Sequence, residues 1–232
     1  QARLEQVATT EITTYEAYLQ GMHNLHEGGF DSLDRAEDYL QQALSQDPGY
    51  LPARLALVHV WSDKAQTGVI SQREAVSRGM PILERVLEEQ PGNAEAHVQK
   101  ALLQIYAREN EAAEQSFQTA LQLAPQNARG LQEYGRFLFD NLQAERGLEM
   151  IQAAVELEPY SIPVLWDQCQ TRGRIQQLEA ALNACERIRE INPDSPLGYY
   201  GRGNAFGYSG NLAQMVKGFS EAIERDPGDY EL

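Results

Sequence analysis

Histidines are the side chains of this sequence best suited to metal or acid–base chemistry, and two of them lie close together. His23 and His26 are three residues apart and Glu27 follows, a spacing that places all three at one end of a predicted helix. A metal site needs three or four ligands in convergent geometry, so a polar helix end before Gly28-Gly29 is the simpler interpretation. His97 occupies a packing position. We therefore expect no metal site and no cofactor.

No other combination of residues predicts an active site. No Ser-His-Asp or Cys-His set has a supporting context, and no glycine-rich phosphate loop follows a predicted strand. Cys169 and Cys185 occupy packing positions, which favours two small buried thiols; a disulfide is the alternative. Two cysteines do not define the redox compartment. The sequence therefore predicts that the protein is not an enzyme.

The charge of the chain narrows the classes of partner. The 232 residues carry a formal net charge of −15. Nucleic-acid phosphates and anionic membrane surfaces both require a basic protein surface, so we expect neither as a partner of this chain. The sequence contains no apolar run of about 18 residues, which argues against membrane insertion. The acidic surface is consistent with solubility of an elongated protein.

The elements that position these residues come from an internal repeat. Two adjacent copies of a 34-residue unit occupy residues 94–127 and 128–161, with small and large residues in register. The same pattern extends along the chain as a ladder of prolines, at Pro48, Pro91, Pro125, Pro159, Pro193 and Pro227. Small residues recur where two helices must approach closely, and each proline ends a helix because it lacks the N–H group. The repeat predicts a helix-turn-helix unit.

We expect about six such units, which must stack because one hairpin cannot bury its apolar face alone. Residues 1–10 are expected to be the end of a linker, with the first helix starting near Thr13 or Thr14. The second unit carries about nine extra residues between Ser62 and Ser71, which predict a loop. The chain starts at Gln1 and stops where a further helix should start, so we expect a piece of a longer protein. Residues 11–232 are predicted to form a single domain, with units at 13–50, 51–93, 94–127, 128–161, 162–195 and 196–229.

A period of 34 with small residues at unit positions 8, 20 and 27 and proline at position 32 resembles the tetratricopeptide repeat. The resemblance implies an all-α superhelix, or α-solenoid. The opening 15–21, the segment 36–50 and the stretched second unit with 71–75 are also similar to one bacterial group. These are the C-terminal repeat domains of membrane-anchored adenylate cyclase-like proteins and winged-helix transcriptional regulators. This likeness implies a periplasmic location, with a cytoplasmic one as the alternative.

The family geometry also implies which residues line the inner groove of the superhelix. Aromatic rings beside amides and arginines suit a protein or peptide partner. The predicted groove residues are Tyr106, Gln132, Arg136, Trp166, Gln170, Arg174, Tyr200, Asn204 and Tyr208. Trp166 and Tyr200 share one repeat position and are expected to be neighbours. The alternative is that some of these side chains pack between adjacent units. A lysine clamp for a terminal carboxylate is not matched, because Val98, Gln132 and Trp166 stand where lysine would be expected.

Two functions remain open at this point. The first is a non-catalytic module that binds protein or peptide, as the sensory or regulatory domain of a bacterial signalling protein. The second is an assembly scaffold in which the ends of the repeat array self-associate into a homo-oligomer. An uncapped terminal unit exposes apolar surface, which favours the second function.

Overall fold

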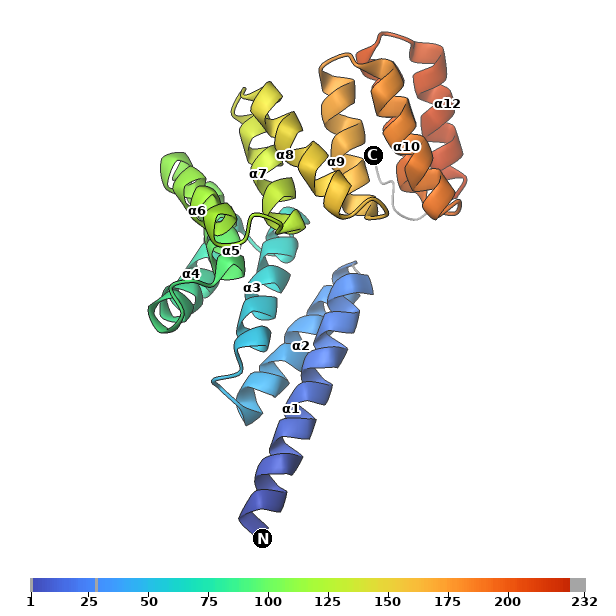
Figure 1. Ribbon diagram of the computed structural model, residues 1–232. Coiled ribbons are helices and arrows are strands. Elements are labelled where there is room, and N and C mark those ends of the chain that lie inside the picture. Colours follow the sequence, from blue (N-terminus) through green and yellow to red (C-terminus); the bar gives the residue numbers. More distant parts are fainter. Residues whose placement is uncertain (1, 28, 226–232) are drawn as a thin grey trace. The chain divides into compact units, whose positions relative to one another are not determined.

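The computed structural model describes residues 2–27 and 29–225, and side chains from residue 12 onward. Every regular element in these ranges is an α-helix, and the twelve helices follow one another as hairpins (Figure 1). The chain divides into two compact units, Gln1–Pro125 and Gln126–Leu232, which are described separately. The prediction that residues 11–232 form one domain stays a prediction. Pro227 and the expected start of a further helix lie outside the described residues.

The first compact unit contains three helical hairpins. In each hairpin two helices pack against one another, and the second helix also contacts the first helix of the next hairpin. The helices are α1 (Ala2–Glu27), α2 (Phe30–Gln46), α3 (Leu51–Gln66), α4 (Gln72–Glu89), α5 (Ala94–Tyr106) and α6 (Asn110–Leu123).

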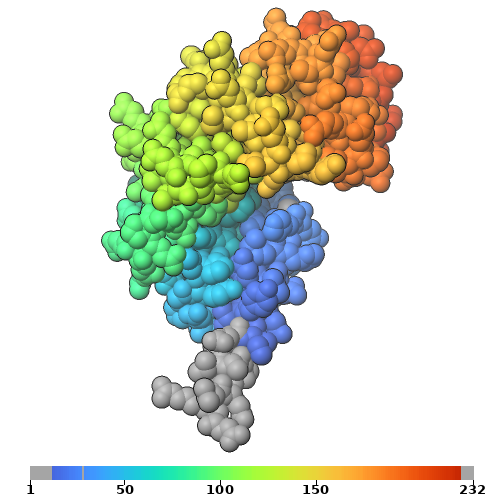
Figure 2. Space-filling view, viewed as in Figure 1, coloured from blue at the N-terminus to red at the C-terminus, as the bar shows by residue number. Residues whose placement is uncertain are grey.

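The second compact unit repeats this arrangement with three hairpins of nearly constant length. Its helices are α7 (Ala128–Asp140), α8 (Ala144–Leu157), α9 (Ile162–Arg174), α10 (Leu178–Ile191), α11 (Pro196–Tyr208) and α12 (Leu212–Ile223). In the space-filling view these helices, coloured from yellow to red, form one continuously packed body (Figure 2). The first helices α7, α9 and α11 are neighbours in space, which brings equivalent repeat positions together.

The helix boundaries follow from local sequence. Asn93 and Asn127 precede α5 and α7. The side-chain oxygen of each accepts a hydrogen bond from the backbone N–H of the third residue of the helix, at 2.9 and 2.8 Å. Such caps satisfy donors that the helix itself leaves unpaired. The turn between the two helices of a hairpin contains one left-handed residue. This conformation is taken by Arg108, Leu142 and Gln176, with φ angles of +62°, +63° and +61°.

Small residues allow the two helices of a hairpin to touch. A Cβ atom added to Gly147 would lie 2.7 Å from the carbonyl oxygen of Gly135 and 2.9 Å from the backbone nitrogen of Phe139. These distances are too short for any side chain, so α7 and α8 meet backbone to backbone. Fully buried Phe117 and Ile151 fill the equivalent layers of their hairpins. The core is thus a stack of helix–helix contacts in which the bulky and small repeat positions alternate.

Two local predictions need correction. Helix α1 begins at Ala2, so a start near Thr13 or Thr14 is wrong. No Gly or Pro separates Ala2 from Thr14, and the threonines therefore continue the helix rather than cap it. Whether residues 1–10 end a linker stays a prediction. The loop predicted at 62–71 is also shorter, because α3 continues to Gln66. Most of the extra residues lengthen the helices: α3 has 16 residues and α4 has 18, against 13 in α5 and 14 in α6.

Candidate functional site

Eight of the nine predicted groove residues lie on one face of the second compact unit, which we call the first-helix face. It is formed by α7, α9 and α11, and neighbouring helices present residues 34 or 35 positions apart in the sequence to one another. Its predicted members are Gln132, Arg136, Trp166, Gln170, Arg174, Tyr200, Asn204 and Tyr208. The repeat places them because one hairpin is followed by the next at a constant spacing.

An aromatic pair occupies the middle of this face. The rings of Trp166 and Tyr200 are stacked, with centroids 5.9 Å apart and planes inclined by 28°, and Tyr200 also contacts Phe219 at 5.1 Å. Trp166 and Tyr200 are therefore neighbours, as their shared repeat position predicts. Gly201 lies beneath the pair, where a Cβ atom would lie 2.9 Å from the sulfur atoms of Cys169 and Cys185 and 3.3 Å from the Trp166 ring. Half-buried stacked rings of this kind offer a rigid apolar platform to a ligand.

Polar contacts join residues of neighbouring first helices that are 34 or 35 positions apart in the sequence. Asn204 donates from Nδ2 to Oε1 of Gln170 at 3.3 Å, one repeat apart. Gln132 donates from Nε2 to Oδ2 of Asp167 at 2.7 Å. Part of the predicted groove is thus engaged in contacts between hairpins, which was the alternative interpretation of these positions. Amides in such pairs retain further donor and acceptor capacity toward a ligand.

Two arginines on this face form ion pairs while their own side chains remain partly exposed. Arg174 lies 2.9 Å from Asp140 and stacks over the ring of Phe139, with its guanidinium carbon 4.5 Å from the ring centroid. Arg136 lies 3.3 Å from Glu133. The side chains of Arg136 and Arg174 are 41% and 46% exposed, so both remain accessible to a partner. Tyr208, at the end of α11, is 45% exposed.

Asp167 is the one titratable group of this face with a strongly shifted pKa. Its side chain is 12% exposed, and burial raises the pKa to about 6 from an ordinary value of 3.8. The Arg136 guanidinium, 3.9 Å away, and the hydrogen bond from Gln132 lower the pKa but do not offset burial. Near neutral pH the face therefore holds a buried carboxylate that retains its proton more readily than an exposed one.

Asp140 and Asp167 are not among the nine predicted site residues, although the family geometry implies that both of their repeat positions face the groove. The sequence itself could have indicated a contact of Asp140, because Asp140 and Arg174 carry opposite charges at the same position of consecutive repeats. Tyr106, the ninth predicted residue, belongs to the first compact unit. Its hydroxyl donates to the carbonyl oxygen of Ser62 at 3.3 Å, and its ring packs against that unit's core.

The two cysteines differ from the favoured expectation. Cys169 of α9 and Cys185 of α10 form a disulfide, where buried thiols were preferred. Both residues are at most 1% exposed. The repeat places their Cα atoms 5.6 Å apart, a separation suited to a disulfide. The sequence spacing could not reveal this, because pairing depends on how the two helices pack.

The histidines that could suggest a metal site lie near the end of α1. His26 contacts the carbonyl oxygen of Met22 through Nδ1 at 2.6 Å, as a polar group at a helix end. Among residues 2–27 and 29–225 no three His, Cys, Asp or Glu side chains gather in a way that could hold a metal ion. None of the helices in these ranges combines the length and apolar character needed to cross a membrane.

Comparisons with known proteins agree with this architecture. A family model described as a tetratricopeptide repeat matches residues 94–127. Among solved structures, the chain is similar to the MamA protein, with 19% identity, a TM-score of 0.55, and coverage of 77% of this chain and 96% of that one. It is also similar to YrrB, described as a TPR protein with an unusual peptide-binding site, with 17% identity, a TM-score of 0.53, and coverage of 82% and 93%.

A third similar structure is PilF of Pseudomonas aeruginosa, with 13% identity, a TM-score of 0.61 and coverage of 95% of both chains. Identities this low define the fold alone. Taken with the proline ladder, the close helix–helix contacts and the matched repeat, they show that this chain has the all-α fold of a tetratricopeptide-repeat solenoid.

Proposed function

We propose that the protein is a non-catalytic binding module that holds a protein or peptide segment on the first-helix face of the second compact unit. The stacked pair of Trp166 and Tyr200 is the observation that carries this proposal. Around it, Arg174 and Tyr208 supply accessible charged and aromatic groups of the kind that anchor interfaces. The similarity to YrrB, whose description names a peptide-binding site, supports the same class of ligand.

We further propose that this module is the sensory or regulatory domain of a bacterial signalling protein, including one that regulates transcription. The likeness of the opening and of the stretched second unit to repeat domains of membrane-anchored regulators supports this role. The Cys169–Cys185 disulfide supports a location on the periplasmic side, because disulfides persist in oxidising compartments and are rare in the cytosol. A cytoplasmic location is the alternative.

A peptide-display selection tests the proposed groove. Peptides enriched on the wild-type protein should bind Tyr208→Ala and Arg174→Glu at least tenfold more weakly. Tyr160→Ala provides a matched control, because Tyr160 is an 80% exposed aromatic residue in the turn between α8 and α9. Circular dichroism verifies that each variant is folded. Enriched peptides that bind both groove variants as tightly as the wild type would refute binding at this face.

A second function, assembly through the end of the repeat array, is favoured by a specific surface. Helix α12 exposes an apolar stripe in which Leu212, Val216 and Ile223 are 65%, 57% and 41% exposed. Such a stripe is the side of a hairpin that a neighbouring hairpin normally covers. Light scattering over a wide concentration range should then detect a dimer that Val216→Glu abolishes. A mass that stays monomeric at every concentration contradicts assembly through α12.

A further inference from the structure

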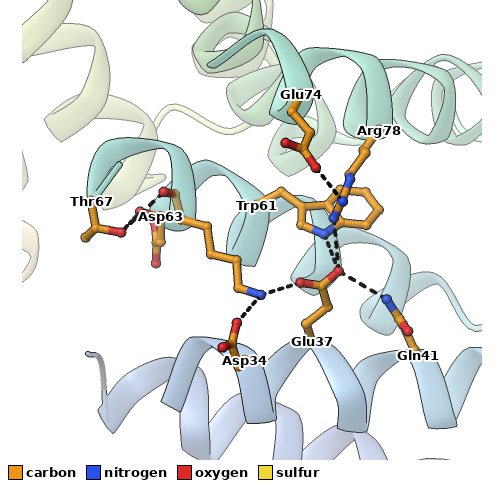
Figure 3. A network of polar contacts seen from close by, with 9 residues as sticks. Asp34, Glu37, Gln41, Trp61, Asp63, Thr67, Glu74 and Arg78 are labelled. Carbon is orange, nitrogen blue, oxygen red and sulfur yellow. Dashed lines mark hydrogen bonds and ion pairs between the residues drawn. The ribbon is translucent and has the colours of Figure 1, made fainter. Parts of the chain in front are cut away.

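The space between the second helices of consecutive hairpins differs between the two compact units. We call this space the second-helix cleft; the intervening first helix forms its floor. In the first unit, between α2 and α4, the cleft is filled by a polar network (Figure 3). Glu37 accepts a hydrogen bond from Trp61 Nε1 at 2.9 Å and forms ion pairs with Lys64 and, at 3.3 Å, with Arg78. Lys64 also lies 2.6 Å from Asp34.

These groups fill the first cleft, and each has a hydrogen-bond or ion-pair partner within the network. The side chains of Lys64 and Glu37 are only 6% and 13% exposed, although both are charged. Arg78 covers Trp61, with its guanidinium carbon 5.7 Å from the ring centroid. In Figure 3 the side chains of Gln41, Trp61 and Arg78, which come from α2, α3 and α4, converge on the carboxylate of Glu37. The buried charges of this cleft are therefore directed at one another.

The equivalent cleft between α10 and α12 is open. Repeat register places Phe206 where the first unit has Trp61, Leu182 where it has Glu37, and Gln214 where it has Arg78. The central carboxylate and its arginine partner are therefore missing, and the network cannot form. Instead the cleft contains a pocket of about 540 Å³. That volume lies in the range typical of sites for small ligands.

A glycine helps to shape this pocket. Gly198 stands at the register position of Ala53. A Cβ atom at Gly198 would lie 2.5 Å from Cγ of Arg189 and 2.9 Å from the carbonyl oxygen of Cys185. Because no side chain is present there, the stem of Arg189 can lie across α11 at the edge of the pocket.

Two arginines replace leucines of the closed cleft. By register, Arg189 corresponds to Leu44 and Arg202 to Leu57. Arg202 lies 2.8 Å from Glu221, and Arg189 pairs with Glu186 and stacks over Tyr199. In each arginine the Nε atom is shielded from solvent and has no hydrogen-bond partner. A ligand acceptor toward which these side chains rotate would satisfy N–H donors that have no partner within the protein.

The exposed fractions of the charged side chains around the pocket favour an anionic ligand. The side chains of Arg189 and Arg202 are 26% and 21% exposed, whereas that of Glu186 is 52% exposed. Glu221, the partner of Arg202, is 26% exposed but does not belong to the pocket lining. The shielded charges of the lining are thus positive, and they lie beside the half-buried apolar groups of Leu182 and Phe206. Guanidinium groups match the planar geometry of a carboxylate with two parallel hydrogen bonds.

We propose that this pocket is a second binding site, separate from the first-helix face, for a carboxylate carried on a compact apolar body. The carboxylate is held by Arg189 and Arg202, and the apolar body contacts Leu182 and Phe206. Both a small organic acid and the C-terminal residue of a peptide have this chemistry.

Calorimetric titration with N-acetylleucine and with its neutral amide tests the proposal. A hexapeptide that ends in leucine, with a free or an amidated terminus, provides the second pair of probes. We expect each acid to bind at least tenfold more tightly than its amide. Binding of N-acetylleucine identifies a small organic acid as sufficient, whereas binding of the hexapeptide alone identifies a chain end. Equal binding of acid and amide, or no binding of any probe, overturns the proposal.

Variants locate the binding. Arg202→Leu restores the residue of the closed cleft and should weaken acid binding at least tenfold. Leu182→Glu should abolish it, because a carboxylate fixed in the pocket competes for the same guanidinium groups. Circular dichroism verifies that this variant, at a half-buried position, is folded. Arg85→Leu, on the exposed face of α4, should bind the acids as the wild type does. Acid binding that survives both pocket variants refutes the site.

Discussion

Replacement of Asp167 by asparagine should stabilise the protein near neutral pH and have no effect in acid. The side chain of Asp167 is 12% exposed and its pKa is raised to about 6 by burial. A carboxyl group whose pKa is higher in the folded than in the unfolded state stabilises the fold when protonated. That stabilisation is complete below 3.8, the ordinary value, and is lost as the pH rises through about 6.

The magnitude follows from the two pKa values. Their difference is about 2 pH units, and each unit corresponds to about 1.4 kcal/mol, so the ionised carboxylate destabilises the fold by about 3 kcal/mol above pH 6. Asparagine keeps an oxygen that can accept the hydrogen bond from Gln132 and carries no charge. The Asp167→Asn variant should therefore gain about 3 kcal/mol at pH 7 and nothing near pH 3.5.

Urea unfolding followed by circular dichroism measures this difference at a series of pH values. Comparison with the wild type cancels the titration of the other carboxylates. Asp140→Asn is a matched control at a 63% exposed position, and its effect on stability at pH 7 should stay below about 0.5 kcal/mol. Arg136→Gln should raise the pKa of Asp167 further, because it removes the nearest positive charge. An Asp167→Asn variant that is less stable than the wild type at pH 7 would falsify the argument.

Four further changes test other parts of the structure. Reduction of the Cys169–Cys185 disulfide should lower the free energy of unfolding by about 3 kcal/mol, given the sequence separation of 16, measured by calorimetry with and without reductant. Gly147→Ala should destabilise by about 1–3 kcal/mol in urea unfolding, because its Cβ meets backbone atoms at 2.7 and 2.9 Å. Lys64→Met should cost about 3 kcal/mol in the same assay, since it leaves a half-paired buried carboxylate. Leu142→Gly should raise the melting temperature, with a gain of about 0.5–1 kcal/mol, because Leu142 holds φ at +63° while 94% exposed.

Control variants and contradicting outcomes distinguish these effects from a general loss of stability. Gly92→Ala should be nearly neutral, since its Cβ would meet only Leu123 at 4.0 Å. A double variant of Lys64→Met with Glu37→Leu should be more stable than Lys64→Met alone, because both charges are then absent. An unchanged melting temperature on reduction would contradict a stabilising disulfide. A loss of stability in Leu142→Gly would contradict strain at that turn.

The sequence alone predicted the repeating hairpins because their causes are local or strictly periodic. The prolines of the ladder, such as Pro125 and Pro159, follow directly after helix C-caps, because a residue without an N–H group cannot continue the helix. Small residues such as Gly135 and Gly147 recur because any larger side chain would separate the two helices. Stacking then places Trp166 beside Tyr200, one repeat apart, without further information. The start of α1 was mispredicted because a threonine cap and a threonine inside a helix look the same without tertiary context.

Other properties were decided only by the tertiary structure, because they depend on side chains that converge from several helices. The pKa of Asp167 reflects how far packing removes its carboxylate from water, which no spacing reveals. Whether Cys169 and Cys185 pair depends on the approach of α9 and α10. The cleft between second helices is filled around Glu37 in the first unit and holds a pocket beside Leu182, the residue at the same repeat position, in the second unit. Periodicity determines where residues stand, whereas the partners that they meet determine what each place can bind.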